Sequence, residues 1–177
     1  MKKRILGIIG GSGLYSIEGL ENIKWRQVST NWGDPSDRIL SATLNRQEIY
    51  FLPRHGRGHK ISPSKINFRA NIEALKKLGV TDIVSVSAVG SLQEYLRPGS
   101  FVIVDQFIDR TFERVKTFFD KDIVAHVSMA KPTSPALMKC CESALVKCKI
   151  PHQVGGTYLV MEGPQFSTLA ESKMYRT

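Results

Sequence analysis

The chain has 177 residues, of which 42% are apolar and 23% charged, the composition of a globular domain with a core of its own. Its apolar runs stay well short of the ~18 residues of a membrane span, and the basic start, Met1 to Arg4, precedes only five apolar residues where a secretory signal needs ~7–15. These features predict a cytoplasmic protein with no membrane partner.

The formal net charge of +9 suits anionic partners. Nucleic-acid-binding proteins usually gather Lys and Arg into a stripe with aromatic residues between them. Here the basic residues are spread along the chain, and the densest cluster, residues 54–60, is typical of a pocket wall. The charge pattern therefore predicts an anionic small molecule as partner and no nucleic acid.

The three cysteines, Cys140, Cys141 and Cys148, fall in one expected helix. An odd number with two adjacent members does not make a disulfide framework. The Cys-x-x-Cys spacing is absent, and the sequence predicts reduced thiols and no metal site.

The first part of the chain is expected to form strands joined by turns. The apolar run Ile5 to Ile9 ends in the glycine-rich stretch 10–13, the pattern of a buried strand followed by a turn whose backbone N–H groups can bind an anion. Further strands are expected at 24–29, 39–44 and 48–53. A tight turn at Asn45-Arg46 joins the last two into a hairpin.

Helices and strands alternate from there on. A helix is expected to open at Ser62-Pro63-Ser64 and to end before Gly79, because its apolar residues recur every three or four positions. Thr168 and Glu171 form a capping box for a last helix. The other expected elements are strands at 82–89, 101–104 and 154–161, a polar loop at 105–111, and a helix from 132–135 to about 149.

This order predicts an α/β fold, a single domain over residues 1–177 with a mixed central β-sheet flanked by helices. Four of the strands end in a polar, glycine-containing loop: after residues 9, 53, 89 and 161. Ligands of open α/β sheets bind beyond the carboxyl ends of the strands. Four such loops at one edge would make one pocket.

The candidate phosphate ligands at these strand ends are Ser12, Arg54, His55, Ser87 and Ala88. Phosphate is bound by backbone amides, hydroxyls and an arginine fork. The competing interpretation is a plain structural turn and a solvated hairpin end. A dinucleotide-binding fingerprint would need glycine or alanine at position 16, where a serine stands, and a Walker A motif is absent.

Three residues have both a structural and a functional interpretation. Glu162 can cap nearby amides or bind sugar hydroxyls, and Phe166 can anchor the last helix or stack on a flat ring. His126 lies in a polar segment that favours an ordinary surface histidine. No nucleophile elbow surrounds Ser12, and the sequence identifies no catalytic residue on this chain.

Five motifs in register resemble the trimeric purine nucleoside phosphorylase family, and in particular its methylthioadenosine phosphorylases. They are Gly7-Ile-Ile-Gly-Gly-Ser-Gly-Leu14, Pro53-Arg-His-Gly-Arg57, Ser87-Ala-Val-Gly-Ser-Leu92, Asp105-Gln-Phe-Ile-Asp-Arg-Thr111 and Glu162-Gly-Pro-Gln-Phe-Ser167.

The resemblance implies phosphorolysis of 5'-methylthioadenosine to adenine and 5-methylthioribose 1-phosphate. Inorganic phosphate is then a co-substrate, and no cofactor or metal is implied. Ser12, Arg54, His55, Ser87 and Ala88 match the family's phosphate-binding positions, two of which, 12 and 87, are often threonine.

On the same resemblance, Phe166 and Ser167 match positions beside the purine, and Glu162 heads their motif. His126 matches a residue that a neighbouring subunit offers to the 5' end of the substrate, which implies a homotrimer.

The family continues past the helix that starts near Thr168, and the expectation is that the chain is C-terminally incomplete. The further part carries a Met-Thr pair at the ribose and an Asp-x-Asp at the purine, and no Asp follows Asp122 here. Two alternatives stay open: a 6-oxopurine nucleoside phosphorylase, and a non-catalytic remnant that binds phosphate or nucleoside.

Overall fold

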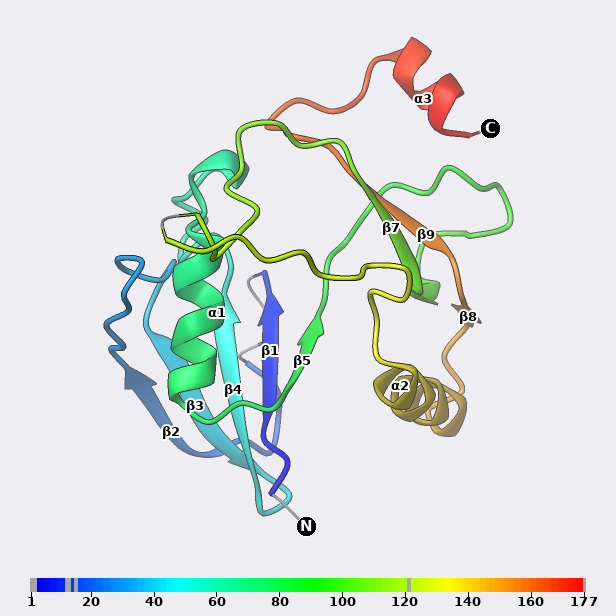
Figure 1. Cartoon of the computed structure of the whole chain (residues 1–177). Helices are drawn as coiled ribbons and strands as arrows, with labels where there is room; N and C mark the ends of the chain where they lie inside the picture. The colour runs from blue at the N-terminus through cyan, green and yellow to red at the C-terminus, as the bar shows by residue number, and fades with distance from the viewer. Residues whose placement is uncertain (1–2, 12–13, 15, 121, 177) are drawn as a thin grey trace. The chain divides into compact units, whose positions relative to one another are not determined.

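The computed structural model describes residues 3–11, 14, 16–120 and 122–176 (Figure 1). Contacts within the chain divide it into two compact units, each described by itself. The first comprises Met1–Ala88 and Val115–Phe118, and the second comprises Val89–Arg114 and Phe119–Thr177. That all 177 residues are the N-terminal portion of one domain stays a prediction.

The first unit contains a five-stranded sheet in the order β2-β3-β4-β1-β5. β1 is parallel to both of its neighbours, β4 and β5, whereas β3 runs antiparallel to both β2 and β4. The sheet is therefore mixed, which confirms the predicted fold class. The strands are β1 (Leu6–Gly10), β2 (Glu21–Arg26), β3 (Ile39–Leu44), β4 (Gln47–Pro53) and β5 (Asp82–Ser85).

The hairpin between β3 and β4 forms where the sequence predicts it. Asn45 and Arg46 have φ angles of 48° and 63°, the left-handed pair that a two-residue turn needs to match the twist of its strands. Two other strands differ from prediction. β2 begins three residues before the expected start, and β5 ends four residues before the expected end, at Ser85, although the Val86 N–H still donates to the Ile9 carbonyl at 2.9 Å.

The carboxyl ends of three neighbouring strands lie at one edge of this sheet. Gly10 of β1 is in register with Pro53 of β4, and Ile9 is in register with Ser85 of β5. Three of the four polar loops thus start from a common edge, as predicted. The fourth, after residue 161, belongs to the second unit.

The core of the first unit occupies both faces of the sheet. Helix α1 (Phe68–Lys77) lies across one face (Figure 1) and buries Ala74 and Leu75 against Ile39 and Leu52, each at most 1% exposed. Burial of an aliphatic side chain of this size stabilises by about 1.5–3 kcal/mol. The other face is filled by a second cluster of buried side chains: Leu40, Ala42, Ile49 and Phe51.

Helix α1 starts later than the sequence predicts. The Ser62-Pro63-Ser64 stretch forms only a 3₁₀ turn, η1 (Pro63–Lys65). Ile66 then takes an extended conformation with its side chain buried, and the Asn67 side chain accepts from the Ala70 N–H as the true N-cap. The predicted end is confirmed, since Gly79 follows the helix with a φ of 82°.

The second unit contains two separate two-stranded parallel sheets. β6 (Phe101–Ile103) pairs with β8 (His152–Val154), and β7 (Gln106–Asp109) pairs with β9 (Thr157–Val160). The prediction of a loop at 105–111 is wrong. The strand β7 was missed because its partner lies about fifty residues later, and all four of its residues are exposed, so no apolar pattern marks it.

The single strand expected at 154–161 is divided in two. Gly155 and Gly156 have φ angles of 84° and 146°, and they separate β8 from β9. The Asp105 carboxylate holds this break by accepting from the Gly156 N–H at 2.9 Å.

Two helices complete the second unit. α2 (Pro135–Lys147) contains Cys140 and Cys141, and all three thiols are free. The predicted capping box of α3 (Leu169–Tyr175) is confirmed, with Thr168 and Glu171 each bonded to the backbone of the other. In the described part of the chain, no helix combines the length and apolar character that a membrane span requires.

Candidate functional site

The Arg54-His55 loop leaves the carboxyl end of β4 and is tied to the neighbouring strand. The Arg54 N–H donates to the Gly10 carbonyl at 3.0 Å, which continues the β1–β4 ladder by one residue. The Gly56 N–H then donates to the Pro53 carbonyl at 2.9 Å, and Gly56 has a φ of 69°. This turn needs a left-handed residue, and glycine adopts that conformation without a side-chain clash.

The structure brings together Arg54, His55 and Ser87, which are up to 33 residues apart in the sequence. The Arg54 Nη1 donates to the Ser87 Oγ at 2.7 Å, and the Arg54 Nε donates to the His55 Nε2 at 3.2 Å. All three residues are partly buried. The guanidinium is thus held from two sides at the edge where the loops start.

The hydrogen bonds of His55 define its tautomer. Its Nδ1 lies 2.8 Å from the Ile61 carbonyl, which can only accept, so Nδ1 carries the hydrogen. Its Nε2 accepts from Arg54 and therefore carries none. The His55 ring is therefore neutral in this arrangement and orients the Arg54 side chain. It stacks on the His59 ring, with 4.3 Å between the two ring centres.

This arrangement can bind an oxyanion. Because the Ser87 Oγ accepts from Arg54, its own O–H is available to donate to a ligand. Charge-assisted bonds from a guanidinium to phosphate are about twice as strong as neutral ones. Ala88 follows Ser87 and is exposed, and Ser12 lies outside the described residues.

An ion pair that the sequence analysis missed holds the far side of the same loop. The Asp37 carboxylate accepts from the Arg57 N–H at 2.7 Å and from its Nε and Nη2 at 3.0 and 2.9 Å. The guanidinium of Arg57 also lies over the Trp25 ring, 4.1 Å from its centre. No sequence pattern marks this pair, since its members are 20 residues apart in two loops.

The pH dependence of stability should report this ion pair. Burial acts to raise the pKa of Asp37, but the bonds from Arg57 and Arg38 outweigh it and hold the pKa below 3.8. A lowered pKa contributes stability that is complete above 3.8 and is lost as the pH falls through the folded-state value. We expect Asp37→Asn to lose less stability than the unmodified chain over that fall, as measured by urea unfolding at several pH values. Equal losses would contradict the assignment.

In the second unit Glu162 is buried, with 6% of its surface exposed, and both of its oxygens face protein groups. Its Oε2 accepts from the N–H groups of Phe112 and Glu113 at 2.7 and 3.1 Å. Its Oε1 lies 3.5 Å from the Arg114 Nε. The structure therefore shows the amide-capping interpretation of Glu162, while its contact with substrate stays a prediction.

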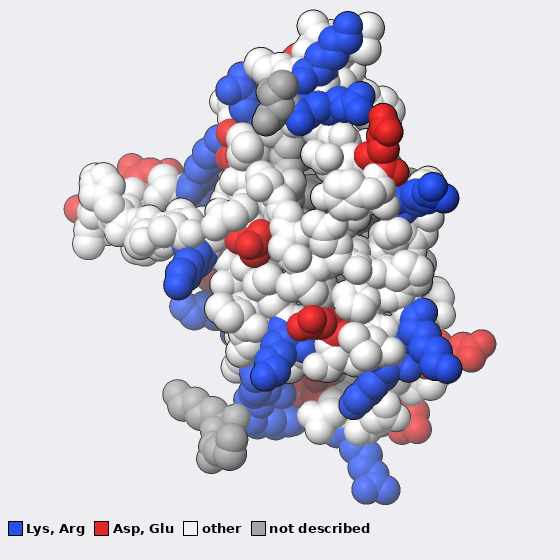
Figure 2. Space-filling model, turned by 90° about the vertical axis from the view of Figure 1, so that its right-hand side faces the viewer, with Lys and Arg blue, Asp and Glu red and all other residues white. Residues whose placement is uncertain are grey.

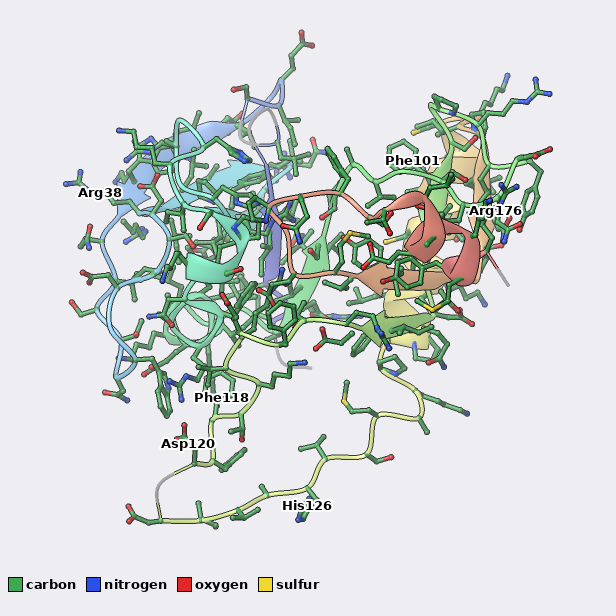
Figure 3. The ribbon with its side chains drawn as sticks, turned by 90° about the horizontal axis from the view of Figure 1, so that it is seen from above. Arg38, Phe101, Phe118, Asp120, His126 and Arg176 are labelled. Carbon is green, nitrogen blue, oxygen red and sulfur yellow. The ribbon has the colours of Figure 1, made fainter. Side chains whose placement is uncertain are left out.

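The remaining candidates of this unit differ in exposure. Phe166 is 93% exposed, so its ring is not an anchor for α3 in the described chain. The Ser167 Oγ shares a hydrogen bond with the Ser172 Oγ at 2.7 Å. His126 is exposed on an extended stretch of chain, with its side chain directed away from the ribbon (Figure 3). The roles of Phe166 and Ser167 beside the purine, and of His126 at the 5' end of the substrate, stay predictions.

The charge distribution agrees with the scattered pattern of the sequence. Figure 2 shows the Lys and Arg side chains of the drawn face as separate groups, with uncharged residues and Asp and Glu side chains between them. Among the described residues, no group of three His, Cys, Asp or Glu side chains is arranged to hold a metal ion.

Comparison with known proteins identifies the relatives of this arrangement. A model of the phosphorylase superfamily matches residues 5–177. The chain is 62% identical over 175 residues to an S-methyl-5'-thioadenosine phosphorylase of Rhodospirillum rubrum and 58% identical to that of Cereibacter sphaeroides. Each alignment covers 99% of this chain and 60% of the relative. The chain thus spans about 60% of the length of these relatives.

Solved structures give the same result. A methylthioadenosine phosphorylase from an antarctic soil metagenomic library matches with a TM-score of 0.93 and 49% identity, covering 99% of this chain and 62% of that one. The methylthioadenosine phosphorylase of Schistosoma mansoni in complex with adenine matches with a TM-score of 0.91 and 36% identity, covering 99% and 70%.

Proposed function

This chain belongs to the phosphorylase superfamily, and on that premise we propose that the whole protein catalyses phosphorolysis of 5'-methylthioadenosine. The products are adenine and 5-methylthioribose 1-phosphate. The observation that carries the proposal is the cluster of Arg54, His55 and Ser87 at the carboxyl edge of the sheet. The names of its relatives support the choice of nucleoside.

The cluster supplies the phosphate side of this reaction. A phosphate oxygen forms the new bond to C1' of the sugar as the bond from C1' to the purine nitrogen breaks, and the bonding pair leaves with the purine. Arg54 and Ser87 hold and aim the phosphate, and positioning of this kind is a main source of rate in a displacement between bound groups. The bound phosphate also stabilises the positive charge that develops on the sugar.

The purine side of the reaction is assigned to other residues. Phe166 would stack on the base and Ser167 would bond to it, with Glu162 fixing the start of their segment. The departing purine needs a proton or a hydrogen bond, and we assign that donor to the Asp-x-Asp that the family carries after the helix near Thr168, a region from which this chain contributes no Asp. Phosphate is the only co-substrate proposed, with no cofactor.

The proposal extends to assembly and location. His126 would reach the 5' end of a substrate bound by a neighbouring subunit, which requires an oligomer, and we propose a homotrimer in the cytoplasm. Its exposure on an extended stretch of chain is compatible with such a contact (Figure 3).

A chimera tests the activity. The chain is joined to the C-terminal 40% of the Rhodospirillum rubrum relative, and adenine release from 5'-methylthioadenosine is measured with and without phosphate. We expect release that requires phosphate, with much slower release of hypoxanthine from inosine. Preference for inosine would favour the 6-oxopurine alternative.

The chain alone is assayed in parallel. Phosphate binding without turnover by the chain, together with turnover by the chimera, would show that the remaining residues are needed for chemistry. If the chimera also binds phosphate but releases no adenine, the proposed activity is wrong and the non-catalytic alternative holds.

A further inference from the structure

The face of the sheet that α1 covers changes from apolar to polar along β3 and β4. Near the carboxyl end of β4 this face carries side chains packed under α1, whereas toward its amino end it carries hydroxyls and a carboxylate. In order, the side chains are Ile39, Ser41 and Thr43 on β3, and Leu52, Tyr50 and Glu48 on β4. The helix thus covers only part of this face.

The uncovered part forms a concavity of about 350 Å³, which we call the amino-end groove. Its charged side chains are those of Lys3, Lys24, Arg26, Arg46 and Glu48. Four cations therefore face one carboxylate, and two further side chains of the lining, those of Asn22 and Thr43, can donate hydrogen bonds to a ligand.

Hydrogen bonds of the buried Ser41 hydroxyl fix one of the arginines that line the groove. The Arg26 Nε donates to the Ser41 Oγ at 2.9 Å, and that oxygen donates to the Lys24 carbonyl at 3.2 Å. Ser41 is 4% exposed, so the guanidinium is fixed by a buried hydroxyl. The Lys24 and Arg46 side chains have no hydrogen-bond or ion-pair partner among the described residues, which leaves two cations for a ligand.

The single carboxylate of the lining, that of Glu48, is already engaged by Tyr50 and Lys3. The Tyr50 hydroxyl donates to one oxygen of Glu48 at 2.6 Å, and Lys3 lies 3.4 Å from the other. The bond from Tyr50 is the largest of the effects that lower the pKa of Glu48, while burial and the same carboxylate raise the pKa of Tyr50 to about 12. Glu48 therefore remains ionised and engaged, and it neutralises Lys3 rather than Lys24 or Arg46.

We propose that the amino-end groove binds an oligophosphate anion, either free pyrophosphate or the phosphate tail of a nucleotide. A ligand with two or more negative charges matches the excess of cations, and its oxygens accept from the hydroxyl and amide donors. The site is separate from the Arg54 cluster, because Glu48 and Arg54 stand at opposite ends of β4, about 20 Å apart at ~3.3 Å per residue.

The test is calorimetric titration of the chain with pyrophosphate and, in separate runs, with ATP. We expect the double variant Lys24→Gln and Arg46→Gln to weaken binding at least tenfold, because both side chains line the groove and neither has a hydrogen-bond or ion-pair partner among the described residues that the substitution would remove. The variant Arg26→Gln should weaken it by a similar factor. Tighter binding of ATP than of pyrophosphate would identify a nucleotide as ligand, and the reverse would identify the free anion.

Two controls decide between this site and others. Lys139→Gln with Lys147→Gln removes the same charge from α2 and should leave binding unchanged. Arg54→Gln removes the cation of the phosphate cluster, and in this background the groove variants should weaken binding as much as they do in the unmodified chain. Equal weakening by the α2 variant would show only general attraction to a basic protein and would overturn the proposal. Loss with Arg54→Gln and none with the groove variants would place the anion at the phosphate cluster and overturn it as well.

Discussion

Replacement of Arg54 by alanine should weaken phosphate binding by about 10- to 100-fold, since charge-assisted hydrogen bonds contribute ~1.5–3 kcal/mol and each 1.4 kcal/mol is tenfold in affinity. The guanidinium bonds to Ser87 and His55 and is the only cation of the cluster, because His55 is neutral. Titration of the chain with inorganic phosphate measures the effect.

The same substitution distinguishes a phosphate ligand from a general loss of structure. In the chimera, Arg54→Ala should raise the KM for phosphate far more than the KM for the nucleoside. Arg38→Ala is the matched control, because Arg38 is exposed and only its backbone N–H makes a described hydrogen bond. Equal increases in both KM values would contradict the placement of Arg54 at the phosphate.

Much of the first unit can be predicted from its sequence because its elements are local. The apolar run before Gly10, the Asn45-Arg46 turn and the apolar spacing of α1 each specify structure over a few residues, and each prediction is confirmed in type. The helix start was misplaced because Pro63 suits a first turn, while burial of Ile66 interrupts the helix at once. The residue at which α1 begins therefore depends on tertiary packing.

Long-range contacts limit how much of the second unit and of the site can be predicted from the sequence. β7 pairs with a strand about fifty residues away and has no buried face, so neither period nor composition reveals it. Arg54, His55 and Ser87 could be named because each follows a strand, and the topology then joins them. The Asp37–Arg57 pair and the contact of Glu162 with Arg114 could not be found in this way, because Asp37 and Arg114 do not stand at the end of a predicted strand.

In the second unit, we expect the replacement of Glu162 to cause the largest loss of stability. Removal of its side chain in Glu162→Ala leaves the N–H groups of Phe112 and Glu113 without this acceptor and takes a carboxylate from Arg114, whose side chain is only 16% exposed. Breaking a buried ion pair from one side costs about 3–5 kcal/mol. We therefore expect the free energy of unfolding to fall by roughly 3 kcal/mol in urea titrations.

Amide hydrogen exchange separates a positioning role of Glu162 from a direct contact with substrate. In Glu162→Gln an oxygen remains to accept from Phe112 and Glu113, so their protection should fall less than in Glu162→Ala. Glu94→Ala, at a side chain that is 92% exposed, should change neither protection nor stability by more than about 0.5 kcal/mol. If Glu162→Gln lowers nucleoside affinity in the chimera while exchange at residues 112 and 113 is unchanged, Glu162 contacts the substrate. If affinity and protection fall together, Glu162 acts by holding the loop of Phe112 and Glu113.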